Sequence, residues 1–242
     1  MQPERKFRYF LALCSAVLII GCGSTSSENV KSQGISARIN VNANNNTTTV
    51  DTTLTVGSPF GTNLVLGGAD SLRATARGVT QTLTKSQSLF VTSYTTTFNF
   101  NVPGTEVVVA LDRPNDQSCP NSRVLMPDPF SVTSPSPDQA FTSQSTIPVN
   151  WTPAGPATGN VEVNFATTCG TVSRSVTSTS ANTGTMLVPV TSVLPTESYN
   201  TAQACTCDIE ISRTANGTLD PNYGEGGSIK GVQARTVRIT LQ

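Results

Sequence analysis

Apolar and polar residues alternate with a period of two along most of this chain. In ISARINV, residues 35–41, every second side chain is apolar, and similar segments follow, separated by Asn and Gly turns. Successive side chains of a strand point to opposite faces of a sheet, so this pattern predicts half-buried strands. No segment has a clear period of 3.6 residues. The alternating segments include ISARINV (35–41), VDTTLTV (50–56), YTTTFNF (94–100), IPVNW (147–151), VEVNF (161–165), CTCDIEI (205–211) and RTVRITL (235–241).

A proline-rich segment interrupts the alternation near the middle of the chain. Four prolines lie between Pro127 and Pro137, and proline cannot donate the backbone hydrogen bond that helices and central strands need. Several short strands on each side of this segment are typical of a β-sandwich. We therefore expect an all-β chain with two sandwiches in tandem, at residues 34–127 and 128–242.

The first 22 residues follow a different pattern. A basic cluster, RKFR at residues 5–8, precedes an apolar run at residues 9–20. A run of about a dozen residues is shorter than the roughly 20 that span a membrane, so the segment is predicted to be an export signal. The run ends in IIGC, residues 19–22, which resembles the lipobox of bacterial lipoproteins.

The lipobox resemblance implies a membrane anchor. Residues 1–21 would be the lipoprotein signal peptide, and Cys22 would be the lipidated first residue of the mature protein. Acyl chains on one Cys attach a protein stably to a lipid bilayer, because each buried methylene contributes about 0.8 kcal/mol. Gly23 stands where the family's inner-membrane retention signal has Asp, which favours the outer membrane of a bacterial cell envelope. Residues 22–33 are polar and small, and we expect them to form a tether.

Two short motifs in the second half resemble fibronectin type III domains, a class of immunoglobulin-like β-sandwich. IPVNWTP, residues 147–153, resembles the strand whose Trp packs between the two sheets, which makes Trp151 a core residue. LPTESY, residues 194–199, resembles the tyrosine corner of the same class. The resemblance covers roughly residues 128–242 and implies a two-sheet sandwich there.

Four cysteines lie outside the export signal and the lipobox, and an even number in an exported chain suggests disulfides. In type III sandwiches the strands that resemble VEVNFATTC and CTCDIEI are antiparallel neighbours, which implies a bond between Cys169 and Cys205. A register slipped by two residues would bring Cys207 there instead, and Cys119 would face the remaining cysteine or stay free. The C-x-C spacing and the absence of His argue against a metal site, so neither a metal nor a cofactor is expected.

Composition excludes several classes of function. The chain has no His, which rules out Ser-His-Asp, Cys-His and H-E-x-x-H sites. Without the signal's three basic residues and one acidic residue, 12 basic and 14 acidic residues remain, a balance that lacks the positive charge of nucleic-acid-binding proteins. Asp208 and Glu210 share one strand face opposite Cys207, and we interpret them as a solvated surface rather than a catalytic pair. We expect no enzyme.

The loop TLDPNYGEGG, residues 218–227, is the candidate binding loop, because loops on a rigid sandwich commonly carry binding sites. Asp220, Asn222 and Glu225 offer oxygen atoms of the kind that Ca²⁺ takes, and Tyr223 is a candidate contact aromatic. The glycine positions do not match an EF-hand. A hairpin without a binding role is the alternative interpretation.

These features predict a non-catalytic, membrane-anchored lipoprotein of the bacterial envelope that acts as a structural or interaction module, of the protein-binding or adhesion-like kind. Its expected partners are the lipid bilayer, through Cys22, and an unidentified envelope protein. A glycan-binding module of the envelope is the alternative. Glycan platforms usually present exposed aromatic side chains, whereas aromatic residues make up 6% of this chain and its one Trp falls in the predicted core.

Overall fold

The computed structural model describes residues 23–88, 91–154, 160–196 and 203–242, and nearly all of their regular structure is strand. The helical elements of these residues are short: the 3-10 turns η1 (Ser27–Asn29) and η2 (Ser32–Gly34), and the α-helical turn α1 (Val190–Val193). Within this described part of the chain, no helix is long and apolar enough to cross a membrane. The all-β prediction is confirmed.

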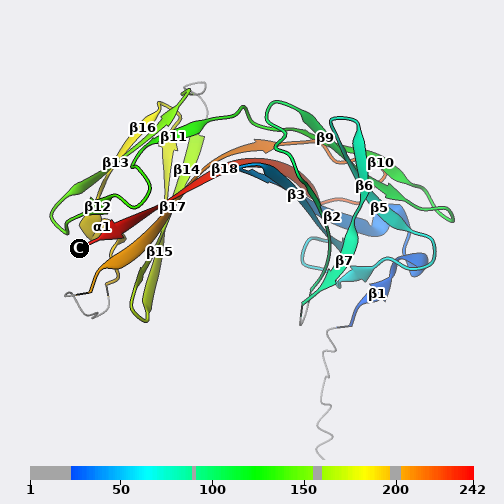
Figure 1. Cartoon of the computed structure of the whole chain (residues 1–242). Helices are drawn as coiled ribbons and strands as arrows, with labels where there is room; N and C mark the ends of the chain where they lie inside the picture. Colours follow the sequence, from blue (N-terminus) through cyan, green and yellow to red (C-terminus); the bar gives the residue numbers. More distant parts are fainter. Residues whose placement is uncertain (1–22, 89–90, 155–159, 197–202) are drawn as a thin grey trace, which may run out of the picture.

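One nine-stranded sheet runs through the molecule (Figure 1). Its strands follow the order β15-β14-β17-β18-β2-β3-β8-β7, and β12 pairs with β18 beside this path. The strands are β2 (Ile35–Asn44), β3 (Thr47–Val56), β7 (Thr84–Gln87), β8 (Thr92–Phe98), β12 (Ala140–Phe141), β14 (Asn160–Cys169), β15 (Val172–Ala181), β17 (Cys205–Asn216) and β18 (Ser228–Leu241).

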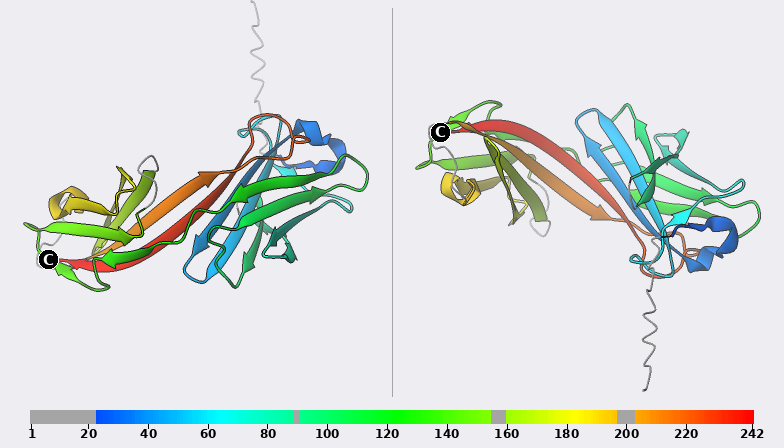
Figure 2. Two further views of the ribbon diagram at one scale, coloured as in Figure 1. Left: turned by 90° about the horizontal axis from the view of Figure 1, so that it is seen from above. Right: turned by 90° about the horizontal axis from the view of Figure 1, so that it is seen from below.

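Smaller sheets complete a sandwich toward each end of the long sheet. We call these two sandwiches the first lobe and the second lobe. The first lobe contains the sheet β10-β9-β5-β6 and the pair β1-β4, and the second lobe contains the sheet β11-β13-β16. The two lobes form an arch in Figure 1, and β17 and β18 connect them in each view of Figure 2. These strands are β1 (Thr25–Ser26), β4 (Leu64–Val65), β5 (Ser71–Ala76), β6 (Val79–Thr82), β9 (Glu106–Asp112), β10 (Cys119–Leu125), β11 (Ser131–Ser134), β13 (Thr146–Thr152) and β16 (Thr185–Pro189).

Each lobe has its own hydrophobic core. Ile39 of β2 and Val109 of β9 belong to one cluster of buried side chains, and Phe165 of β14 belongs to a second. The proline-rich segment connects the clusters, because Met126 packs in the first and Phe130 in the second. The alternation of the sequence therefore produces two cores, each built from the inward faces of opposed sheets.

The hairpin of β17 and β18 belongs to both lobes. Ile239, near the end of β18, is buried in the second core, whereas Ile229 and Tyr223 are buried in the first. The first half of β18 pairs in parallel with β2. The expected second domain, residues 128–242, therefore differs from the observed division, since the tip of the hairpin returns to the first lobe. A strand of 14 residues is roughly 45 Å long at about 3.3 Å per residue, more than one sandwich needs.

Side chains also hold the hairpin to the second lobe where it crosses between the lobes. Two arginines of the hairpin contact the ring of Phe130: the guanidinium carbons of Arg213 and Arg235 lie 4.7 Å and 5.5 Å from its centroid. Arg213 is buried and donates to Asn182 Oδ1 at 3.1 Å, which also accepts from Trp151 Nε1 at 2.8 Å. Trp151 is thus a core residue, as the fibronectin resemblance implies. The tyrosine of the LPTESY motif lies outside the described residues.

The predicted disulfide between Cys169 and Cys205 is confirmed. β14 and β17 are antiparallel neighbours, and their register places Thr168 opposite Thr206. The two cysteines are one position further along each strand, so they face each other, and their Cα atoms are 4.4 Å apart. The bond therefore closes the end of the sheet in the second lobe.

The other two disulfide candidates, Cys119 and Cys207, are free buried thiols. Cys119 belongs to the first core and Cys207 to the second, so the separation of the lobes prevents a bond between them. Burial raises the pKa of Cys119 to about 12 and also raises that of Cys207. Both groups therefore stay protonated at neutral pH and are poor nucleophiles.

The first prediction concerns the disulfide. The Cys169→Ala/Cys205→Ala variant should lower the free energy of unfolding of the second lobe by about 3–4 kcal/mol, since the bond closes a loop of 36 residues. Denaturant titration followed by Trp151 fluorescence measures this directly, because the chain's one Trp lies in that lobe. As a control, reductant should shift the midpoint of the wild type and leave that of the variant unchanged. A peptide linking Cys169 to Cys119 or Cys207 would contradict the pairing.

Candidate functional site

The candidate binding loop at residues 218–227 is docked against the first lobe. It connects β17 to β18, and the backbone N–H of Gly224 donates to the carbonyl of Ile35 at 2.9 Å. A Cβ atom at Gly224 would collide with the backbone carbonyl of Gln33, so this close approach requires glycine. The loop is therefore a fixed part of the lobe rather than a free arm.

The polar side chains of this loop hold it to β10. Asp220 is buried, and its carboxylate accepts hydrogen bonds from the backbone N–H groups of Asn121 at 2.8 Å and Asn222 at 2.9 Å. The Asn222 amide donates to the carbonyl of Ser118 at 2.8 Å. Because the Asp220 carboxylate and the Asn222 amide form hydrogen bonds within the protein, these two residues hold the loop in place. Glu225 is exposed.

Tyr223 does not present its ring to a partner, which corrects the expectation from sequence. The residue is 6% exposed and packs in the first core, and burial raises the pKa of its phenol well above the usual value. The sequence carries no signal for this burial, because Tyr223 lies in a loop where the period-two pattern does not apply. The predicted contact aromatic is thus a core residue.

The two carboxylates of the candidate loop have different surroundings, since Asp220 is buried against backbone N–H groups and Glu225 is exposed. Within the described ranges, no group of three or more His, Cys, Asp or Glu side chains could hold a metal ion.

Asp208, on the strand before the loop, forms an ion pair on the sheet surface, where Arg238 donates from Nε at 2.7 Å and from Nη2 at 2.8 Å. This hydrogen-bonded pair lowers the pKa of Asp208. Glu210, two residues along the strand, is exposed.

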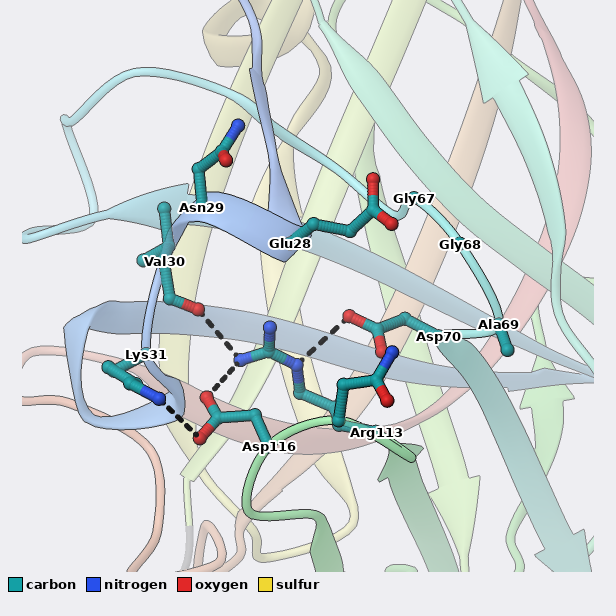
Figure 3. A pocket seen from close by; sticks show the side chains of 11 residues that line it. Glu28, Asn29, Val30, Lys31, Gly67, Gly68, Ala69, Asp70, Arg113 and Asp116 are labelled. Carbon is teal, nitrogen blue, oxygen red and sulfur yellow. Dashed lines mark hydrogen bonds and ion pairs between the residues drawn. The ribbon is translucent and has the colours of Figure 1, made fainter.

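A buried arginine that sequence reasoning missed joins the N-terminal segment to the first lobe (Figure 3). Arg113 follows β9, and its side chain is 3% exposed. Its Nε donates to Asp70 at 3.0 Å, and its Nη1 donates to Asp116 at 2.9 Å. The guanidinium therefore lies between two carboxylates, as a buried cation requires.

The same guanidinium binds the backbone of residues 27–32. Nη1 donates to the carbonyl of Val30 at 2.9 Å, and Nη2 donates to the carbonyl of Ser27. The carboxylates bind this segment as well: Ser27 Oγ donates to Asp70 at 2.7 Å, and the backbone N–H of Ser32 donates to Asp116 at 2.9 Å. We call Arg113, Asp70 and Asp116 with Ser27 and Ser32 the arginine clamp.

The arginine clamp corrects the expectation that residues 22–33 form a tether. From Thr25 onward the chain is docked, because β1 pairs in parallel with β4 and the turns η1 and η2 lie on the clamp. The sequence of this segment is polar, and a polar segment without alternation is easily interpreted as a linker. In the structure, the segment is held by hydrogen bonds to a buried guanidinium and two carboxylates rather than by the packing of apolar side chains. Cys22 lies outside the described residues.

A pocket of about 220 Å³ lies beside the arginine clamp. Glu28 and the backbone of Gly67 and Gly68 form part of its wall (Figure 3). The Nε, Nη1 and Nη2 atoms of Arg113 all donate to acceptors within the protein. Hydrogen bonds from backbone N–H groups, first that of Gln117, lower the pKa of Asp116 and keep it charged. Lys31 Nζ lies 3.6 Å from Asp116 Oδ1, so the two carboxylates face two cations. The cluster is therefore a structural contact whose charges are balanced once Lys31 is included.

A second hollow, of about 440 Å³, lies on the outer face of the long sheet. The loop between β3 and β4 forms one wall, and Phe60 at this loop is 92% exposed. Arg38 of β2 and the exposed Val91 also line it. In the sequence, Phe60 stands in GSPFGTN, where an apolar residue among turn formers is out of step with the alternation. That irregularity is the signal by which sequence reasoning could have found it.

Comparison with known proteins does not extend what the structure itself shows. The sequence matches no protein-family model, and no curated protein is recognisably similar. Among solved structures, an I-band fragment of titin has 8% identity and a TM-score of 0.24, over 85% of this chain and 65% of that chain. SGBP-B of the Bacteroides ovatus mixed-linkage glucan utilization locus, in complex with a mixed-linkage heptasaccharide, has 10% identity and a TM-score of 0.19, over 90% and 66%. The chain spans slightly less than two thirds of each, and similarities this weak carry no inference about fold or function.

The second prediction concerns the arginine clamp. Arg113→Ala should lower the free energy of unfolding of the first lobe by about 3–5 kcal/mol, because it leaves the buried carboxylate of Asp70 without its cation. Far-UV circular dichroism in denaturant measures the loss, and proteinase K should then cleave the segment of residues 25–34. The matched control is Arg73→Ala in the exposed pair with Asp112, which should cost no more than about 1 kcal/mol. Equal losses in the two variants would contradict the role of the clamp.

Proposed function

We propose that this protein is a lipid-anchored, non-catalytic interaction module of a bacterial cell envelope. Cys22 would carry the acyl chains, and the two joined lobes would present their surfaces to an envelope protein. The observation that carries the proposal is the arginine clamp, which binds the chain to the first lobe within a few residues of the lipobox. A protein attached by lipid at its N-terminus is thereby held as a rigid body at the membrane.

The continuous sheet supports an interaction role. It sets the second lobe at a defined position beside the first, through the hairpin of β17 and β18 and the contacts of Phe130 with two arginines. β15 forms an edge of this sheet, with ten residues that are mostly Ser, Thr and Val. Exposed strand edges present unpaired backbone groups, which an extended segment of another protein can bind.

Glycan binding is less well supported by the side chains. Sugar platforms need exposed aromatic rings, and both Trp151 and Tyr223 are buried. Among the described residues, Phe60 is the one aromatic side chain that is exposed, and it lies in the same lobe as the N-terminal segment. The proposed partner class is therefore protein.

The third prediction tests the anchor. Cys22→Ser should abolish incorporation of radiolabelled palmitate, because the acyl chains are expected on the sulfur and on the α-amine of Cys22. Mass spectrometry of the purified protein should show the loss of acyl mass. The matched control is Cys14→Ser, which changes a cysteine inside the apolar run and should leave the labelling intact. Palmitate labelling that persists in Cys22→Ser would sink the proposal.

A further inference from the structure

The loop that carries Phe60 lies directly beside the N-terminal segment. The backbone N–H of Thr25 donates to the carbonyl of Asn63 at 2.9 Å, and Thr25 is paired with Leu64. Phe60 is three residues before Asn63 in the chain, and Cys22 is three residues before Thr25. At up to about 3.6 Å per residue, Cys22 reaches no more than roughly 11 Å from this hydrogen bond. Acyl chains on Cys22 would thus hold the loop close to the bilayer surface.

From this placement we propose that the loop of residues 57–63 enters the membrane interface, with Phe60 inserted among the lipids beside the acylated Cys22. The inference rests on the proposed lipid anchor and adds a second contact to it. The occupant of this surface is the bilayer, because the chain outside the described residues leaves the lobe at this loop. An exposed aromatic or aliphatic side chain at the headgroup level is the means by which peripheral proteins contact lipid.

The surroundings of Phe60 suit a shallow insertion. Pro59 and Gly61 flank it, so the ring stands on a short turn in which Gly61 N–H donates to Ser58 O at 2.9 Å. The exposed Val91 lines the same hollow and enlarges the apolar surface. The tip of the β17–β18 hairpin supports the loop from the other side, since Gly226 lies against Pro59.

One basic residue lies in the wall of the hollow. Arg38 of β2 is exposed there and can meet lipid phosphates once the ring is inserted. Its single charge gives little long-range attraction to an anionic surface, so apolar insertion rather than charge is expected to dominate. The contact should accordingly form on vesicles with little anionic lipid.

The test uses the full-length lipidated protein in vesicles of phosphatidylethanolamine with a minor share of phosphatidylglycerol. Phe60→Trp places an indole on the loop, and the buried Trp151 contributes a constant background that the wild type measures. The matched control is Leu187→Trp, at a side chain that is 69% exposed in the second lobe. Lipids brominated in the acyl chain should quench the added emission of Phe60→Trp by about twofold, since interfacial groups lie roughly 5–10 Å deep. The added emission of Leu187→Trp should not change.

The outcomes separate the two proposals. Protein that floats with the vesicles while Phe60→Trp is unquenched overturns the insertion and leaves the anchor standing. Protein that fails to float overturns the anchor and the insertion together. Quenching of both variants to the same degree also contradicts a specific loop contact. If a mixed-linkage glucan heptasaccharide shifts the Phe60→Trp emission in detergent and brominated lipid has no effect, the hollow is a glycan site and the membrane contact is wrong.

Discussion

The molecule depends on one ladder of backbone hydrogen bonds, the antiparallel pairing of β17 with β18. It runs from Cys205 opposite Leu241 to Asn216 opposite Lys230, and each lobe attaches a different neighbour to it. β14 pairs with β17 in the second lobe, and β2 pairs with β18 in the first. Buried backbone groups must find partners, so removing the hairpin would leave unpaired strands in both cores. The two lobes therefore share one continuous sheet.

Charged residues make up only 12% of this chain. Three of them, Arg113, Asp70 and Asp116, lie where the N-terminal segment offers little apolar packing. Residues 27–32 offer few apolar side chains to a core, yet their carbonyl and hydroxyl groups surround the guanidinium of Arg113. Ion pairs of this kind tolerate little rearrangement, because each partner that is lost leaves a buried charge. The first lobe thereby acquires a rigid N-terminal edge instead of a loose linker.

Much of the fold could be predicted because a period of two has only one register that buries the apolar face. The bond between Cys169 and Cys205 follows from that register together with the fibronectin resemblance. The arginine clamp could not be predicted, since Arg113 and its acceptor in Ser27 are 86 residues apart and neither lies in an alternating segment. The burial of Tyr223 could not be predicted either, because this residue lies in a loop without alternation. Periodicity describes strands, whereas loops take their places from distant contacts.

The parallel pairing of β2 with the last strand has a consequence for the time course of folding. Arg38 is opposite Ser228, so the N-terminal lobe cannot finish its sheet until almost the whole chain has been delivered. Contacts of such large sequence separation make folding slow, and a chain exported from its N-terminus would expose the free edge of β2 during that interval. A chain cut short before the hairpin would leave β14 without its partner β17 and β2 without its partner β18, so neither lobe would complete its sheet.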